Sequence, residues 1–222
     1  MSGANRGIGK AVAEGLLAKG YRLSLGTRRP ELLEDLAGDR VLAHAYDALD
    51  PSSAEAWVAA TIARFGQLDG LINNAGASRH ATIEDGPDED FEYLWRVNAM
   101  GPLRMTRLAL PHLKRCGHGR IVNVVSLSGK RVRNDHAAYA MSKYAALALT
   151  HGTRRVGWDS GVRVTALCPS WVATDMAKSA KVPRSEMIQP EDLAELVVTV
   201  LALPNSAAIA ELLVNCRFED TL

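Results

Sequence analysis

The chain has 222 residues, and this length suits a single domain with a full-sized core. Its apolar fraction of 47% and charged fraction of 23% are those of an ordinary soluble globular protein. A formal net charge of +1 gives no electrostatic reason to expect binding to nucleic acid or to an anionic membrane.

Short apolar runs alternate with longer helical patterns along the chain. The strands are expected at 21–26, 41–46, 68–72, 120–126, 162–168 and 210–215. The helices are expected at 30–38, 52–65, 88–115, 137–158 and 190–203. Strands rich in Val, Ile and Leu that alternate with helices indicate a parallel sheet covered on both faces. The sequence therefore predicts one α/β domain over 1–222, a doubly wound sheet of Rossmann type, with ligands beyond the carboxyl ends of the strands.

The first ten residues, MSGANRGIGK, contain a cluster of glycines. Gly3, Gly7 and Gly9 precede the amphipathic pattern AVAEGLLAKG. Glycines let backbone amides approach a pyrophosphate, and a helix start adds a partial positive charge. The same cluster is also compatible with a simple tight turn.

Tyr139 and Lys143 are four residues apart in YAMSK, within a predicted helix. This spacing places both side chains on one helix face. A neighbouring ammonium favours the phenolate, so Lys143 is expected to lower the pKa of Tyr139 toward neutral pH. The alternative is that Tyr139 packs at the helix start while Lys143 is solvated.

Other polar residues follow the predicted strands. Ser126 ends the strand RIVNVVS thirteen residues before Tyr139, Asn98 lies in VNAMG, and the segments NNAG (73–76) and PSWVATDM (169–176) each close a strand. Together with the glycine cluster, this set resembles the classical short-chain dehydrogenase/reductase family over nearly the whole chain.

The resemblance implies catalytic roles for four residues. Tyr139 corresponds to the general acid/base, and Lys143 to the residue that lowers the tyrosine pKa and hydrogen-bonds the nicotinamide ribose. Ser126 matches the serine that polarises the substrate oxygen, with Ser128 as a nearby alternative. Asn98 matches the asparagine of a water-linked proton relay, and it could also be a helix-interior amide bonded to backbone.

The resemblance also implies a cofactor site at the strand ends. Its residues are Ser2, Gly3, Asn5, Arg6, Gly7, Ile8, Gly9, Thr27, Arg28, Asp47, Asn74, Ala75, Gly76, Asn98, Tyr139, Lys143, Pro169, Val172 and Thr174. Ser170 replaces a common glycine and requires a negative φ or a strained backbone. Trp171 either shapes the substrate pocket or packs under a short substrate lid expected at 177–189, and Tyr93 is a candidate pocket wall.

The predicted cofactor is NADP(H). NAD-preferring sites place an acidic residue after the second strand, where it binds the ribose 2′-hydroxyl. This chain has LGTRRPE there. Thr27, Arg28 and Arg29 would not repel a phosphate, and an arginine side chain can bind one, although either arginine could simply be solvated. Arg6 is a second guanidinium at a position where NADP-type members carry a basic residue. We expect reduction of a ketone or aldehyde, and the competing hypothesis is a sensor or scaffold that binds NADP(H) without turnover.

Cysteine and histidine usage bears on location and on metals. Three cysteines without a CxxC pair are typical of a reducing cytoplasm. The six histidines are scattered and none pairs with a cysteine or carboxylate at metal-ligand spacing, so no metal site is predicted. No apolar run is long enough to span a membrane, and the start lacks a signal-peptide pattern. We expect a cytoplasmic homodimer or homotetramer built on the two long helices, although their apolar surface could equally be core.

The family's first strand should precede the glycine cluster, but only Met1 and Ser2 do. Without this strand, the two central strands beside it would keep unpaired backbone groups, at a cost of roughly 1–3 kcal/mol per buried group. The phosphate loop would also be untethered. One interpretation is that the true start lies upstream. The other is that the sheet closes up or another segment fills the gap, with poor cofactor binding. We expect the first.

Overall fold

The computed structural model describes residues 1–218 and has six strands, all in parallel pairs. The strands are β1 (Leu23–Thr27), β2 (Val41–Ala45), β3 (Gly70–Asn73), β4 (Arg120–Val124), β5 (Arg163–Pro169) and β6 (Glu211–Val214). The helices are α1 (Gly7–Ala18), α2 (Pro51–Phe65), α3 (Asp88–Trp95), α4 (Gly101–Cys116), α5 (Ala137–Gly157) and α6 (Pro190–Ala202). This alternation confirms the predicted Rossmann-type α/β fold.

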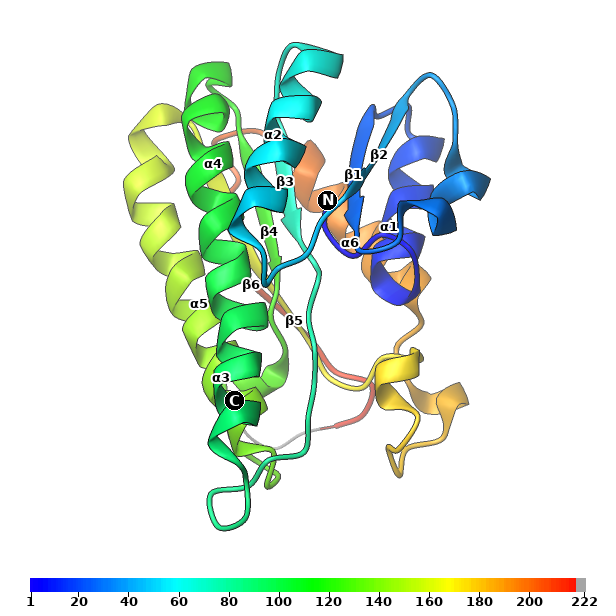
Figure 1. Ribbon diagram of the computed structural model, residues 1–222, viewed down its shortest axis with the longest axis vertical. Helices are drawn as coiled ribbons and strands as arrows, with labels where there is room; N and C mark the ends of the chain where they lie inside the picture. The colour runs from blue at the N-terminus through cyan, green and yellow to red at the C-terminus, as the bar shows by residue number, and fades with distance from the viewer. Residues whose placement is uncertain (219–222) are drawn as a thin grey trace.

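Helices cover both faces of the strands. Figure 1 shows α1 and α6 on one side and α4 and α5 on the other. One core joins Leu16 of α1 and Leu193 of α6 to Leu25 of β1, and all three side chains are buried. The second core packs Trp57 of α2 and Met105 of α4 against the opposite face of the strands. Burial on both faces explains why the strand sequences are almost continuously apolar.

The strands form a pair, β1–β2, and a separate set of four in the order β3–β4–β5–β6. Residues Met1 to Gly3 lie between the two sets. Ser2 forms a parallel bridge with Gly26, and its amide donates to the carbonyl of Ile72 at 3.0 Å. The amide of Gly3 donates to the Gly26 carbonyl at 2.8 Å, and the Gly26 amide donates to the Met1 carbonyl at 2.9 Å.

The expectation of an untethered phosphate loop is therefore wrong. The first residues of the chain occupy the position of a strand between β1 and β3 and bond to both. Backbone groups make the bonds that anchor the loop, so the anchoring does not require a long run of apolar side chains. The Met1 ammonium donates to the Ser24 carbonyl at 2.6 Å, and burial lowers its pKa to about 5.

Two predicted helices differ in kind. The segment Pro30–Leu36 is a 3-10 helix. The long helix expected at 88–115 is divided into α3, a π-helical segment Arg96–Met100, and α4. Pro102 has no amide to continue the α-helical ladder, which accounts for the irregular turn before it. Among the described helices, none is both long and apolar enough to cross a membrane.

Candidate active site

The glycine loop forms a narrow cradle before α1. Gly3 and Gly7 have φ angles of 68° and 53°, which favour glycine. A Cβ on Gly9 would lie 2.0 Å from the Gly3 carbonyl oxygen, so no larger residue fits. Arg6 occupies the N-cap of α1 without a side-chain cap. The first amides of α1 have no acceptor within the helix, and a helix start of this kind suits an anion such as a pyrophosphate.

The loop is fastened to the NNAG segment after β3. The Ser2 hydroxyl accepts from the amides of Asn74 and Ala75 at 3.1 and 3.0 Å. The Asn74 side chain donates to the carbonyls of Ser2 and Gly3 at 3.1 and 2.9 Å. These bonds hold the first residues of the chain beside the segment that follows β3.

Ser126 and Tyr139 meet beyond the end of β4. Ser126 caps a single 3-10 turn, and its Oγ accepts from the Ser128 amide at 3.1 Å. The Ser126 side chain also lies near the Tyr139 hydroxyl in the first turn of α5, close enough to lower the pKa of the phenol. Ser126, rather than its neighbour Ser128, is thus the serine that the structure pairs with Tyr139.

Lys143 lies one turn further along α5 and is buried. Its Nζ donates to the Val124 carbonyl at 2.9 Å and lies 5.6 Å from the centre of the Tyr139 ring. Burial lowers the pKa of Lys143 to about 8. A Cβ on Gly76 would lie 3.7 Å from this Nζ, so the NNAG segment reaches the same site.

The expected fall in the Tyr139 pKa is wrong for the structure described here. Burial raises the pKa of Tyr139 to about 12, and the nearby Ser126 hydroxyl opposes that rise. The Lys143 ammonium is directed to a backbone carbonyl instead of the phenol oxygen, so it does not offset the desolvation. At neutral pH the phenol carries its proton, and it can donate one.

Asn98 is buried in the π-helical segment and bonds in three directions. Its Nδ2 donates to the Ala77 carbonyl at 2.9 Å and to the Ser142 hydroxyl at 3.0 Å. Its Oδ1 accepts from the Ala77 amide at 2.9 Å. The side chain therefore orients the segment after NNAG and joins it to α5. Sequence reasoning missed Ser142, whose signal is its position three residues after Tyr139 on the same helix.

The segment after β5 returns to the glycine loop. The Thr174 methyl would lie 3.0 Å from a Cβ on Gly7. Pro169 ends β5, and Val172 forms a parallel bridge with Ile188, which ties the segment to the far end of the expected lid. Ser170 does not adopt a left-handed φ, nor does any other non-glycine residue described, and its amide donates to the Val214 carbonyl at 2.8 Å. The substitution for glycine causes no backbone strain.

The side of the site beside β1 contains basic groups. Thr27 is buried, and its hydroxyl donates to the Asn5 side chain at 3.1 Å. Arg28 follows it and is exposed. Arg6 is exposed and pairs with Asp175 at 3.3 Å. The Asp47 carboxylate accepts from the Leu49 amide at 2.9 Å.

Two groups of possible metal ligands lie among the described residues. One consists of Asp69, Cys116 and His118, and the other of His80, Asp135 and His136. The search along the sequence missed both. Cys116 lies two residues before His118 and Asp135 is adjacent to His136, but the third member of each group comes from another part of the chain.

Comparisons with known proteins agree with this geometry. The sequence model of the short chain dehydrogenase family matches residues 1–184. The chain is 46% identical to "Agropine synthesis reductase" of Rhizobium rhizogenes over 99% of its length, which is 52% of that protein. The chain thus spans about half the length of the first curated relatives it matches. It is 31% identical to the 3-oxoacyl-[acyl-carrier-protein] reductase FabG of Vibrio cholerae, covering 94% of this chain and 91% of that protein.

Solved structures give the same result. An alcohol dehydrogenase from Thermococcus sibiricus complexed with 5-hydroxy-NADP superimposes with a TM-score of 0.89 at 30% identity, covering 96% of this chain and 94% of that one. A 3-ketoacyl-(acyl-carrier-protein) reductase from Brucella melitensis complexed with NADH also gives 0.89, at 27% identity, with 97% and 95% covered.

Proposed function

The chain belongs to the short-chain dehydrogenase/reductase family, and we propose that it is an NADP(H)-dependent reductase of a ketone or aldehyde. The observation that carries this proposal is the group formed by Ser126, Tyr139 and Lys143 at the end of β4. Two hydroxyls lie near each other there, and a buried amine lies beside them. Such a group can hold a carbonyl oxygen and give it a proton.

The residues of the glycine cradle fit a dinucleotide. A Cβ on Gly9 would lie 2.0 Å from the Gly3 carbonyl oxygen, so the loop and the start of α1 pack too closely for any side chain there. Amides at the start of α1 would bind the pyrophosphate, and Thr174 would close the cradle against Gly7. When bound there, the reduced nicotinamide supplies the hydride.

The hydroxyls act on the substrate oxygen. We assign Ser126 to orient that oxygen by hydrogen bonding and Tyr139 to protonate it as negative charge develops. Because burial keeps the pKa of Tyr139 at about 12, the phenol is a proton donor at neutral pH, which suits reduction. Lys143 holds the ribose side of the site, and Asn98 positions the backbone around Ala77.

The preference for NADP(H) is proposed from charge. Arg28 is exposed directly after β1, and Arg6 is exposed at the start of α1, where a 2′-phosphate could be bound by guanidinium groups. No acidic residue follows β1 before Pro30. The Thermococcus relative is complexed with an NADP derivative and the Brucella relative with NADH, so this assignment rests on the residues of this chain.

A second copy of this chain is the partner we propose for α5. Open grooves of about 420 and 500 Å³ are both lined by Trp95 of α3 and Met141 of α5. These two side chains are 49% and 56% exposed, and Tyr144 is 42% exposed beside them. Neither groove is lined by Ser126, Tyr139 or Lys143, so this apolar face is separate from the catalytic group.

The function is tested by NADPH oxidation against a panel of carbonyl compounds. The panel contains simple ketones and aldehydes, a 3-oxoacyl thioester after the FabG relative, and a precursor of agropine after the Rhizobium relative. Turnover of any of them, with NADPH preferred to NADH, supports the proposal. If the protein binds NADPH but oxidises it with no compound of the panel, it is the sensor or scaffold. If NADPH fluorescence does not change on titration, the protein lacks the cofactor site.

A further inference from the structure

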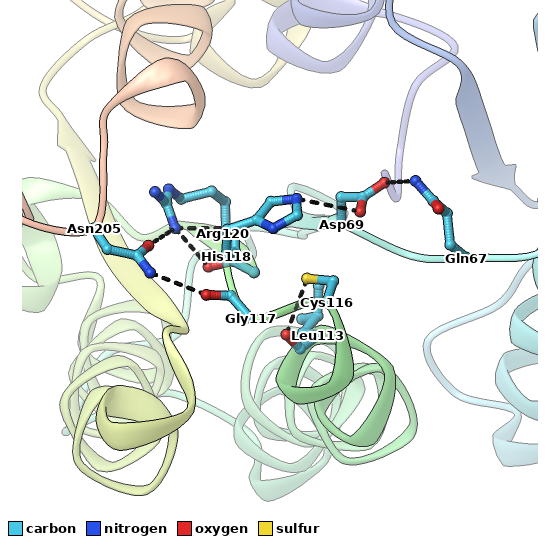
Figure 2. A network of polar contacts seen from close by, with 9 residues as sticks. Gln67, Asp69, Leu113, Cys116, Gly117, His118, Arg120 and Asn205 are labelled. Atoms are coloured by element: carbon cyan, nitrogen blue, oxygen red, sulfur yellow. Dashed lines mark hydrogen bonds and ion pairs between the residues drawn. The ribbon is translucent and has the colours of Figure 1, made fainter.

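A second cluster of reactive side chains lies at the opposite ends of the strands (Figure 2). Asp69 precedes β3, Cys116 ends α4, and His118 lies two residues before β4. Since β3 and β4 pair Gly70 with Arg120, these three residues meet at the amino-terminal edge of the sheet. One ligand atom from each lies within 4.8 Å of the other two. We propose that Asp69, Cys116 and His118 bind a zinc ion.

The donor set is one that zinc accepts. Thiolate, imidazole and carboxylate are its usual protein ligands, and three of them leave a fourth position for water. The Asp69 Oδ1 and His118 Nε2 atoms are 3.6 Å apart, too far for a hydrogen bond. Two ligands on a tetrahedral zinc ion with bonds of about 2.0–2.1 Å are separated by about 3.3 Å. The side chains of Asp69 and His118 are 45% and 65% exposed, so small rotations can bring them onto the ion.

Outer contacts already orient the carboxylate and the loop. The Gln67 side chain donates to Asp69 Oδ2 at 2.9 Å, while Oδ1 faces His118. The Asn205 side chain donates to the Gly117 carbonyl at 3.0 Å and accepts from Arg120 at 2.8 Å. Such partners fix the direction of metal ligands. Figure 2 shows these contacts converging around the loop between Cys116 and Arg120.

Arg120 fixes the backbone of the loop that carries His118. Its guanidinium donates to the His118 and Gly119 carbonyls at 3.0 and 3.1 Å. On the ion, one thiolate and one carboxylate would balance the charge of Zn²⁺. Calcium and magnesium prefer sets of oxygen ligands, which this cluster lacks.

Zinc at this position would lie away from the proposed catalytic residues. It would join the end of α4 to the starts of β3 and β4. The five residues of β4 alone separate it from Ser126 by roughly 16 Å, so it touches none of the proposed catalytic residues. The group His80, Asp135 and His136 is the weaker candidate, because His80 and Asp135 already bond each other at 3.2 Å.

Cobalt(II) titration of the metal-free, reduced protein tests the proposal. Cobalt at this site should give a thiolate charge-transfer band in the near-ultraviolet and visible bands of tetrahedral coordination, at one ion per chain, and zinc should remove them. Cys116→Ser should abolish the charge-transfer band, and Cys216→Ser, which changes another partly buried cysteine, should retain it. His118→Gln should weaken zinc binding at least about tenfold.

Thermal unfolding gives an independent readout. Zinc should raise the Tm of the parent protein and of a His80→Gln control, but not that of His118→Gln, whose exposed side chain can be changed without disturbing the fold. Absence of a thiolate band in the parent protein would overturn the proposal. So would zinc binding to Cys116→Ser or His118→Gln as tight as to the parent, which would assign the metal to His80, Asp135 and His136.

Discussion

The side chain of Ser126 lies near the hydroxyl of Tyr139, although one residue follows β4 and the other lies in the first turn of α5. The single 3-10 turn Leu127–Gly129 and the loop after it bring the two together. Gly129 is needed there, because a Cβ would lie 2.7 Å from the Lys143 carbonyl oxygen. The pair of hydroxyls thus depends on close packing between that turn and α5.

Gly9→Ala should abolish cofactor binding. The new methyl group would meet the Gly3 carbonyl oxygen at 2.0 Å, which forces the cradle open. We expect NADPH affinity to fall at least about 100-fold, since well-placed phosphate contacts are lost together. Gly152→Ala is the matched control on α5, where nothing lies within 4 Å, and it should leave affinity unchanged. Fluorescence titration with NADPH measures both, and equal affinity in the two variants would contradict the cradle.

Arg28→Asp should shift the cofactor preference toward NADH. The carboxylate would repel a 2′-phosphate and could accept from a ribose 2′-hydroxyl. We expect kcat/KM for NADPH to fall by about 10- to 100-fold and the ratio of NADH to NADPH use to rise. Arg155→Asp, an exposed change on α5, is the control. If steady-state kinetics show the same cofactor ratio in Arg28→Asp and the parent protein, the phosphate is bound elsewhere.

The sequence could predict which residues lie at the strand ends of this site but not their protonation. Ser126, Tyr139 and Lys143 were placed from strand ends and helical spacing, and these patterns follow directly from backbone geometry. The rise in the Tyr139 pKa was missed, because it depends on how deeply the phenol is desolvated and on the carbonyl that Lys143 selects.

Two further features were also beyond the sequence. The first three residues are anchored by backbone bonds, from Ser2 to Ile72 and from Met1 and Gly3 to Gly26, which no side-chain pattern reports. The grouping of Asp69 with Cys116 and His118 depends on strand register, which brings together residues nearly fifty positions apart. Periodicity along one element carries no information about such contacts.

Lys143 should make stability depend on pH. Burial lowers its pKa from 10.5 in an exposed lysine to about 8, so the unfolded chain binds more protons between these values. The free energy of unfolding of the cofactor-free protein should therefore gain up to about 3 kcal/mol from this group as pH rises from 8 to 10.5. Lys143→Met should lack that gain. Urea unfolding of both proteins across this range measures the difference, and parallel curves would mean that the pKa of Lys143 is not lowered.

Met141→Glu should dissociate the proposed homodimer. A charge on the exposed apolar face of α5 would be buried against a second copy without a partner. Sedimentation velocity should show a dimer for the parent protein and for Leu32→Glu, an exposed apolar position outside α5, and a monomer for Met141→Glu. If the parent protein sediments as a monomer at all concentrations, the proposal that a second copy binds to α5 is contradicted.

The most direct test of the central assignment is Tyr139→Phe, assayed with the best carbonyl substrate of the panel. This change removes only the hydroxyl that lies near Ser126. We predict that kcat for NADPH oxidation falls about 100- to 10,000-fold, as expected for loss of a general acid, while NADPH affinity changes less than about threefold. An undiminished kcat with cofactor binding intact would contradict the assignment of Tyr139 as the proton donor.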